Sequence, residues 1–301
     1  VKAHHPLELY ETLLRVYEEK GEKDKMLDAK AEAKRFFAIR FPPMRYGQDN
    51  REIAAHPDTR EITDSLGSLK GFSASVGKRV YEASLCPHES FVDVLSSLSS
   101  KGLKAKIEPL VLIDYFVAFG NQRELLRILD AFDRLKQGDA KELDRGSIDG
   151  TPLEETVRKF STWTTKAGTE AKRYKLTNAR SLLKEIESAI YGLKLPDLSI
   201  VQKIHYYNEI TGLPYISGLE SDRKKLFVRE VMPVKRKSDG KQFGYGVCTQ
   251  SIGSGVEARF TVFNRVFDKD PIQKGDVILL KDFTREGKYF TLTAYSHLEE
   301  N

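Results

Sequence analysis

The sequence predicts a multidomain α+β protein with an all-α N-terminal two-thirds followed by a C-terminal five-stranded β-barrel. Apolar residues repeat at helical spacing over most of the chain up to about Gly218. Five short β-prone segments then follow one another between residues 226 and 298. Only one longer connection, residues 264–274, interrupts them, between the third and fourth segments.

The composition is that of an ordinary soluble protein with apolar material for two or three compact units. The chain has 301 residues, of which 40% are hydrophobic and 31% charged. A net charge of +5 permits a nucleic-acid partner. Cys86 and Cys248 match no zinc or redox spacing, so we expect reduced thiols in a cytoplasm. We find no bilayer-spanning run and no secretory leader, and Val1 at the first position suggests a piece of a longer chain.

Two amphipathic helices are predicted at the N-terminus. The first follows Pro6 and carries Leu9, Tyr10, Leu13, Leu14 and Tyr17, and the second carries Met26, Ala29, Ala33, Phe36 and Phe37. Pro42 and Pro43 end the second helix. Residues 44–63 are predicted to form an irregular loop with room for a short extended piece.

Capping signals predict the later helices. Helices are predicted to start at Ser90, Asn121, Thr151 and Ser199, and glycine stops follow at Gly192 and Gly212. Residues 137–150 are charged and contain glycine, which indicates a mobile connection. Residues 161–175 are polar and weakly patterned.

Two segments have the outline of a helix-hairpin-helix. In residues 66–80, and again in residues 113–123, an apolar helix end, a glycine turn and a new helix follow one another. Such a turn brings backbone N–H groups close to a phosphate, and the next helix adds its positive dipole end. The candidate DNA-binding residues are Lys70, Gly71, Phe72, Ser73, Gly77, Lys78 and Arg79 in the first hairpin and Gly120, Asn121, Gln122 and Arg123 in the second. Purely structural glycine turns are the alternative.

The five C-terminal segments predict a nucleic-acid-binding barrel. They cover residues 226–234, 242–250, 256–263, 276–283 and 289–294. The Asp239-Gly240 pair supplies a tight hairpin turn between the first two. Five strands with one longer joint fit an OB-type Greek-key barrel, which binds oligonucleotides through its strand 2–3 face and its 1–2 and 4–5 loops.

Both of those loops are basic. The first carries Lys235, Arg236, Lys237 and Lys241, and the second carries Arg285 and Lys288. Residues 222–245 hold eight basic and three acidic side chains, a balance that would attract a phosphate backbone. Candidate base-stacking aromatics are Phe243, Tyr245, Phe260 and Phe263, which could instead fill the barrel core.

These segments resemble the C-terminal part of the bacterial DNA polymerase III alpha subunit, a C-family replicative polymerase. Residues 2–8 (Lys-Ala-His-His-Pro-Leu-Glu) are similar to the segment that leads a fingers helix in that family. Residues 66–71 resemble its glycine hairpin, and residues 118–126 (Ala-Phe-Gly-Asn-Gln-Arg-Glu-Leu-Leu) resemble its most specific signature. Residues 228–231 (Val-Arg-Glu-Val) match its opening barrel strand. Ser73 departs from the family hairpin, which has a second glycine there, as expected of a divergent or viral member.

The resemblance implies four parts. They are the end of a fingers domain (1–50), a tandem helix-hairpin-helix region (51–136), a helical linker (137–221) and an OB-fold domain (222–298). Duplex and single-stranded template DNA are the implied ligands, and a sliding clamp or clamp loader is an implied partner. In this family the Mg²⁺-binding carboxylates lie in an upstream palm domain. We therefore expect no catalytic residue, metal ligand or cofactor in this chain.

Two other functions stay open. A stand-alone DNA-binding accessory protein could share these modules. A protein-interaction scaffold could instead dock replisome subunits on the barrel without touching DNA.

Overall fold

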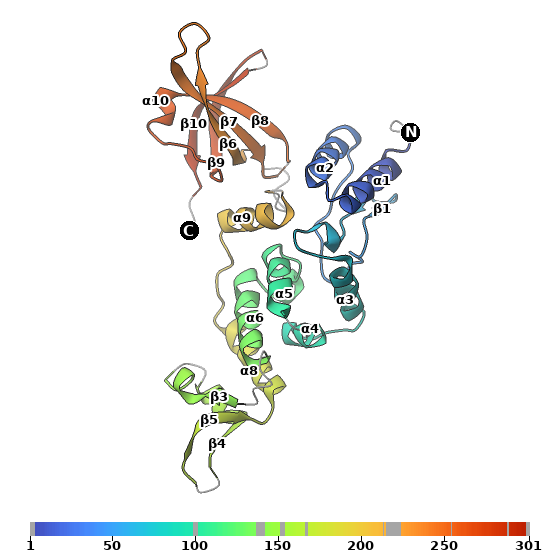
Figure 1. Cartoon of the computed structure of the whole chain (residues 1–301), viewed down its shortest axis with the longest axis vertical. Coiled ribbons are helices and arrows are strands. Elements are labelled where there is room, and N and C mark those ends of the chain that lie inside the picture. Colours follow the sequence, from blue (N-terminus) through green and yellow to red (C-terminus); the bar gives the residue numbers. More distant parts are fainter. Residues whose placement is uncertain are drawn as a thin grey trace. The chain divides into compact units, whose positions relative to one another are not determined.

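The computed structural model describes residues 4–98, 102–136, 142–150, 154–165, 168–212, 214, 224–253, 255–287 and 289–298. The chain divides into two compact units, each discontinuous in sequence. Unit 1 comprises Val1–Pro43, Glu52–Gly71 and Ser199–Asn301, and unit 2 comprises Met44–Arg51 and Phe72–Leu198. Both units contain helices and strands (Figure 1), which confirms the mixed α+β class.

The first part of unit 1 is a helix pair with a short β-hairpin. Its elements are α1 (Pro6–Glu19), α2 (Lys23–Phe37), β1 (Ala54–His56), β2 (Glu61–Thr63) and the 3₁₀ helix η1 (Leu66–Ser68). Tyr10 and Leu14 of α1 pack in one buried cluster with Ala29 and Ala33 of α2. The two predicted amphipathic helices are thus confirmed, because their apolar stripes face each other.

A closed five-stranded barrel forms the second part of unit 1. Its strands are β6 (Lys225–Lys235), β7 (Gln242–Ser251), β8 (Glu257–Phe263), β9 (Val277–Glu286) and β10 (Tyr289–His297). They close in the order β10-β8-β7-β6-β9, with β8 and β10 parallel and the other pairs antiparallel. The five predicted strands are therefore confirmed in number and position. The longer connection after β8 contains the short helix α10 (Asn264–Phe267).

The helix α9 (Ile200–Thr211) packs against the outside of this barrel. Val201 and Ile204 share a buried cluster with Phe227, Ile252 and Val277 of the barrel segment. A capping box at Ser199 and Gln202 begins α9, and Gly212 ends it with a φ of 77°. The sequence signals at both ends of this helix are confirmed.

Unit 2 is a helical body with a three-stranded sheet. Its helices are α3 (Ala74–Ser84), α4 (Phe91–Ser97), α5 (Leu103–Leu112), α6 (Gln122–Lys136), α7 (Glu154–Lys159) and α8 (Ala179–Gly192), with 3₁₀ turns η2 (Val117–Phe119) and η3 (Arg145–Ser147). The sheet has the order β3-β5-β4, from β3 (Glu142–Asp144), β4 (Ser161–Thr164) and β5 (Glu170–Leu176). None of the described helices has the length and apolarity needed to cross a membrane.

The prediction of an all-α N-terminal two-thirds is wrong. The β1-β2 hairpin and the β3-β5-β4 sheet both lie before the barrel. Of the seven residues of β5, only Tyr174 is buried, so this strand lacks the apolar alternation by which a strand is recognised. Charged cross-strand contacts accompany the sheet instead, because Glu142 of β3 pairs with Arg173 and Lys175 of β5 at 3.5 Å.

A buried carboxylate links α4 to α8 in unit 2. Asp93 is 8% exposed; its carboxylate accepts a hydrogen bond from Arg180 at 2.6 Å, and its backbone N–H donates to Oγ of the Ser90 cap at 3.2 Å. Lys184 forms an ion pair with the same carboxylate at 2.9 Å. Burial alone would raise the pKa of Asp93, but the hydrogen bonds from Arg180 and Lys184 lower it to about 2.

Replacing Gly244 and Gly246 by alanine should affect stability differently. A Cβ at position 244 would collide with the backbone carbonyl oxygen of Val262, whereas one at position 246 would lie 3.1 Å from the movable Nη2 of Arg259. We expect Gly244→Ala to cost about 1–3 kcal/mol of unfolding free energy and Gly246→Ala less than about 1 kcal/mol. Urea unfolding measures the free energy of unfolding of each variant. Equal losses of unfolding free energy would contradict the close approach of Gly244 to Val262.

Acid should weaken unit 2 through Asp93. Because the pKa of Asp93 is lowered, its contribution is present above the unfolded-state pKa of about 3.9 and is lost as the pH falls through about 2. Between pH 5 and pH 2.5, the wild-type protein should lose roughly 1–2 kcal/mol more unfolding free energy than Asp93→Asn. Denaturant titrations of both proteins at each pH make the comparison, and parallel pH profiles would refute it.

Candidate nucleic-acid interface

The β6–β7 hairpin presents exposed cations. Gly240 has a φ of 68°, and its N–H donates to the carbonyl of Arg236 at 3.0 Å, which closes the predicted turn. The candidate cations Lys235, Arg236, Lys237 and Lys241 are all exposed. Within the described chain, Arg236 alone of these four forms an ion pair, with Asp239 at 3.9 Å. The positive charges of this hairpin thus lie in solvent.

The β9–β10 hairpin adds an exposed arm. Residues 281–287 are all exposed, and Gly287 turns the chain with a φ of 60°. Arg285 lies over the ring of Phe290, 5.4 Å from its centroid, and donates from Nε to the carbonyl of Gly287 at 3.0 Å. The other predicted cation of this loop, Lys288, lies outside the described residues.

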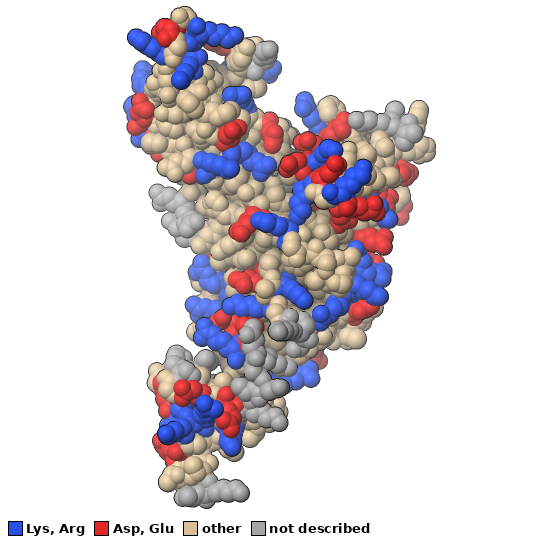
Figure 2. All heavy atoms as spheres, in the orientation of Figure 1, with Lys and Arg blue, Asp and Glu red and all other residues tan. Residues whose placement is uncertain are grey.

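Strand β8 joins the two hairpins into one surface. It pairs with β7, which begins at the first hairpin, and with β10, which begins at the second. Both hairpins project from the upper end of the barrel in Figure 1, and Figure 2 shows Lys and Arg atoms with few acidic atoms over that end. The sequence predicted the two basic loops, but it did not predict that β8 would pair with both strands that follow them.

The barrel aromatics divide between core and surface. Phe260 is 4% exposed and lies in the barrel core, and Tyr245 is stacked on Phe267 with ring centroids 3.7 Å apart. Phe260 and Tyr245 therefore fill the barrel core, as the alternative interpretation of the sequence expected. Phe263 is 46% exposed and lies beside the half-buried Phe243, with centroids 5.9 Å apart. That pair has ring surface on the outside of β7 and β8 on which a base could stack.

Two further aromatic side chains are exposed, and the sequence patterns did not identify them. Phe283 on β9 is 42% exposed, and Tyr289 at the start of β10 is 67% exposed. Their position beside the basic 4–5 loop was a usable signal, because aromatic residues interleaved with cations are typical of single-strand binding surfaces.

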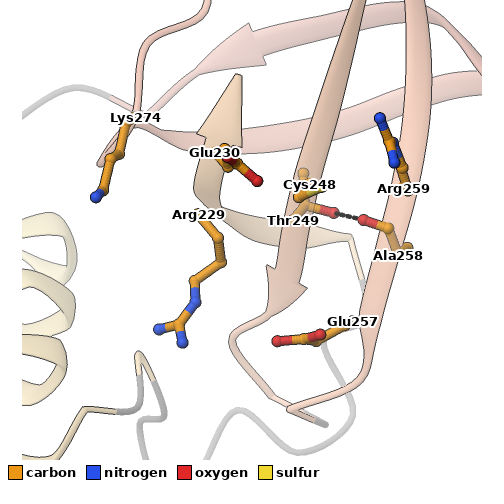
Figure 3. A pocket seen from close by; sticks show the side chains of 8 residues that line it. All are labelled: Arg229, Glu230, Cys248, Thr249, Glu257, Ala258, Arg259 and Lys274. Carbon is orange, nitrogen blue, oxygen red and sulfur yellow. Dashed lines mark hydrogen bonds between the residues drawn. The ribbon is translucent and has the colours of Figure 1, made fainter. Parts of the chain in front are cut away.

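A pocket of about 560 Å³ opens on the outer face of the same barrel (Figure 3). Arg229 and Glu230 come from β6, Cys248 from β7, Glu257 and Arg259 from β8, and Lys274 from the loop before β9. From the sequence, Arg229 and Glu230 entered only the charge balance of residues 222–245 and the barrel-strand resemblance, and none of these residues was predicted to bind a ligand. The sequence signal for this site was the adjacent charged pair Arg229 and Glu230 inside the otherwise apolar β6.

The first helical hairpin contains the boundary between the two units. Lys70 and Gly71 belong to unit 1 and Phe72 to unit 2. Gly71 is exposed with a φ of 80°, as a tight turn requires, but the segment before it is the short 3₁₀ helix η1 instead of an apolar α-helix. Lys70 is exposed, and burial together with this neighbouring ammonium lowers the pKa of Lys23.

The unit 2 side of that hairpin is helix α3. Ser73 precedes it in an extended conformation, its side chain makes no capping bond, and Gly77 is buried within the helix. Lys78 forms only a 3.9 Å contact with Glu82, whereas Arg79 donates to the carbonyl of Leu98 at 3.0 Å. Lys78 is thus the more available cation, and Phe72 is half-buried.

In the second helical hairpin, other residues of the same chain already bind the predicted phosphate-contacting groups. Asn121 and Glu124 bond each other's backbone N–H groups at the start of α6, as the sequence predicts. The amide of Asn121 donates to the carbonyl of Leu195 at 2.8 Å. Gln122 is 1% exposed; its side chain donates to Leu112, and its N–H donates to the carboxylate of Asp197 at 3.2 Å.

An internal carboxylate therefore lies where a phosphate was predicted to bind. A built Cβ on Gly120 would lie 3.0 Å from the ring of Tyr191, so this glycine also serves close packing. Of the four candidates in this hairpin, only Arg123 keeps a side chain without a bond among the described residues.

Metal chemistry has no evident site in the described ranges. Within them, no group of three or more His, Cys, Asp or Glu side chains lies close enough to hold a metal ion.

No protein-family model matches the chain, and no curated protein matches it significantly. The fold defines a mixed α+β protein that carries a closed five-stranded barrel with two basic hairpins.

Proposed function

We propose that the barrel is of the OB type and that it binds single-stranded nucleic acid across β8. The observation that supports this most is that β8 pairs with both strands that leave a basic hairpin. A strand order of first-second-third-fifth-fourth, with a helix between the third and fourth strands, fits that barrel type. The hairpin cations contact phosphates, and Phe263 with Phe243 offers a stacking surface.

The helical part contributes to duplex binding through its first hairpin. In unit 1, Lys70 is exposed and Gly71 leaves the backbone open at the turn; in unit 2, Lys78 is exposed on α3. Each of these groups can contact a phosphate without reading the sequence. The second hairpin contributes Arg123, since its helix start already binds Asp197.

The resemblance to C-family polymerases supplies the biological context. We propose that this chain is the DNA-binding C-terminal portion of a replicative polymerase alpha subunit. Its helical hairpin would hold the duplex, and its barrel would hold the template strand. Nucleotidyl transfer and its Mg²⁺ would belong to a palm domain on another part of such a protein, and a sliding clamp or clamp loader would be its partner.

Single-strand affinity should fall steeply with salt. If four to six phosphates are contacted, raising salt from 50 to 200 mM should weaken binding to an oligothymidine by roughly 50- to 300-fold, because counterions are released on binding. Fluorescence anisotropy of a labelled oligonucleotide measures this. Equal affinity at both salt concentrations would refute a phosphate-contact surface and favour the scaffold function.

Reversing the charge of the first hairpin should reduce single-strand binding more than duplex binding. The triple variant Lys235→Glu, Arg236→Glu and Lys237→Glu removes up to three phosphate contacts, so the slope of log affinity against log salt should become shallower by roughly 2. A variant with the same net charge, Lys106→Glu, Lys172→Glu and Lys269→Glu, alters exposed lysines elsewhere. Equal effects of the two triple variants would remove the hairpin from the interface.

Two neighbouring phenylalanines should separate binding from folding. Phe263→Ala, on the exposed side of β8, should weaken single-strand binding by roughly 5- to 150-fold at little cost in stability, since one stacked base contributes about 1–3 kcal/mol. Phe260→Ala, in the core, should instead cost about 3–5 kcal/mol of unfolding free energy. Unchanged binding by a folded Phe263→Ala protein would rule out stacking at this position.

A further inference from the structure

The pocket on the barrel face holds charges of both signs that do not meet. Within the described chain, no hydrogen bond or ion pair joins the side chains of Glu230, Glu257, Arg259 or Lys274 to any other group. In Figure 3 the side chain of Arg229 leaves β6 and extends toward the lower left, and the carboxylate of Glu257 on β8 extends toward the open space between the two residues. Acceptors and donors therefore surround about 560 Å³ of open space instead of neutralising one another.

Arg229 is fixed in place with part of its guanidinium still available. Its Nη1 donates to the side-chain oxygen of Asn208 at 3.1 Å and to the carbonyl of Gly212 at 3.2 Å. A guanidinium has five N–H donors, and no described residue accepts from those on Nε and Nη2, so these donors can bind a ligand. Because α9 already orders this side chain, binding through it loses little conformational entropy.

The guanidinium of Arg259, on β8, lies close to Gly246 of β7. A Cβ built on Gly246 would lie 3.1 Å from its Nη2 and 3.3 Å from its Nε, so the absence of a side chain at Gly246 lets the guanidinium approach the strand. The guanidinium plane is a surface on which a nucleobase can stack. Arg259 is one of the residues that line the same pocket.

We propose that this pocket binds one nucleotide and prefers guanine. Lys274 and the remaining donors of Arg229 take the phosphate, and the carboxylate of Glu257 or Glu230 accepts the base N–H groups. A pocket for phosphate alone is disfavoured, because two carboxylates would repel it. Guanine presents adjacent ring and amino N–H donors that one carboxylate can accept together, whereas uracil presents a single N–H. The inference deepens the proposed function and rests on it, since it assigns one nucleotide of the bound strand to this site.

Cys248 provides a direct readout of occupancy. It lines the pocket, and the only other cysteine, Cys86, is exposed in unit 2 and serves as an internal control. The intact chain is treated with N-ethylmaleimide in the presence of GMP, UMP or inorganic phosphate, and modification of each thiol is followed by mass spectrometry. Saturating GMP should slow modification of Cys248 at least about fivefold, with UMP protecting at higher concentration and phosphate least, while the rate at Cys86 stays unchanged.

Pocket variants identify the groups that read base and phosphate. Glu257→Gln with Glu230→Gln should abolish the preference for GMP over UMP, and Lys274→Ala should weaken both nucleotides alike. These side chains are solvent-exposed, so the variants should fold. Absence of protection, equal protection by phosphate, or an unchanged GMP preference in the double glutamine variant would overturn the proposal.

The same measurements separate this inference from the proposed function. The hairpin charge-reversal variant should lose oligonucleotide affinity and keep GMP protection of Cys248. Salt-dependent oligonucleotide binding without any GMP protection would overturn the pocket alone. GMP protection in a chain that binds no oligonucleotide would overturn the single-strand function and leave a nucleotide pocket.

Discussion

The parallel pairing of β8 with β10 is the constraint on which the interface depends. Phe290 and Thr291 pair with Phe260 and Thr261, which closes the barrel. Without this ladder, β8 and β10 would be free edges of an open sheet, with unpaired backbone groups and no fixed separation between the hairpins that precede β7 and β10. One short ladder therefore fixes both the fold and the relative position of two cationic loops.

A register shift in β6 gives one arginine two roles. Pairing with β7 passes from Val228 to Glu230, which leaves Arg229 outside the ladder. A bulge of this kind re-aims a side chain, and here it directs the guanidinium to Asn208 and Gly212 at the end of α9. The hydrogen bonds that join Arg229 to Asn208 and Gly212 therefore add to the docking of α9 on the barrel and also order a donor at the pocket.

Local signals in the sequence predicted the barrel well and its surroundings less well. The five strands and the turn at Gly240 follow from β-propensity and glycine conformation, which act within a few residues. The β3-β5-β4 sheet was missed because it buries Tyr174 but little else of β5, so no apolar alternation marks it. The carboxylate of Asp197 at the start of α6 could not be foreseen, since that contact spans 75 residues of chain.

On the proposed interface, different side chains would supply affinity and selectivity. Exposed lysines on a hairpin attract any phosphate backbone and carry no sequence information. The pocket has a different balance, because the carboxylates of Glu230 and Glu257 oppose an anion and accept hydrogen bonds from donor groups. On our proposal, a strand held by the hairpins would gain from the pocket only when the nucleotide placed there offers suitable donors. Selectivity would then depend on the acidic side chains, since the basic ones treat every sequence alike.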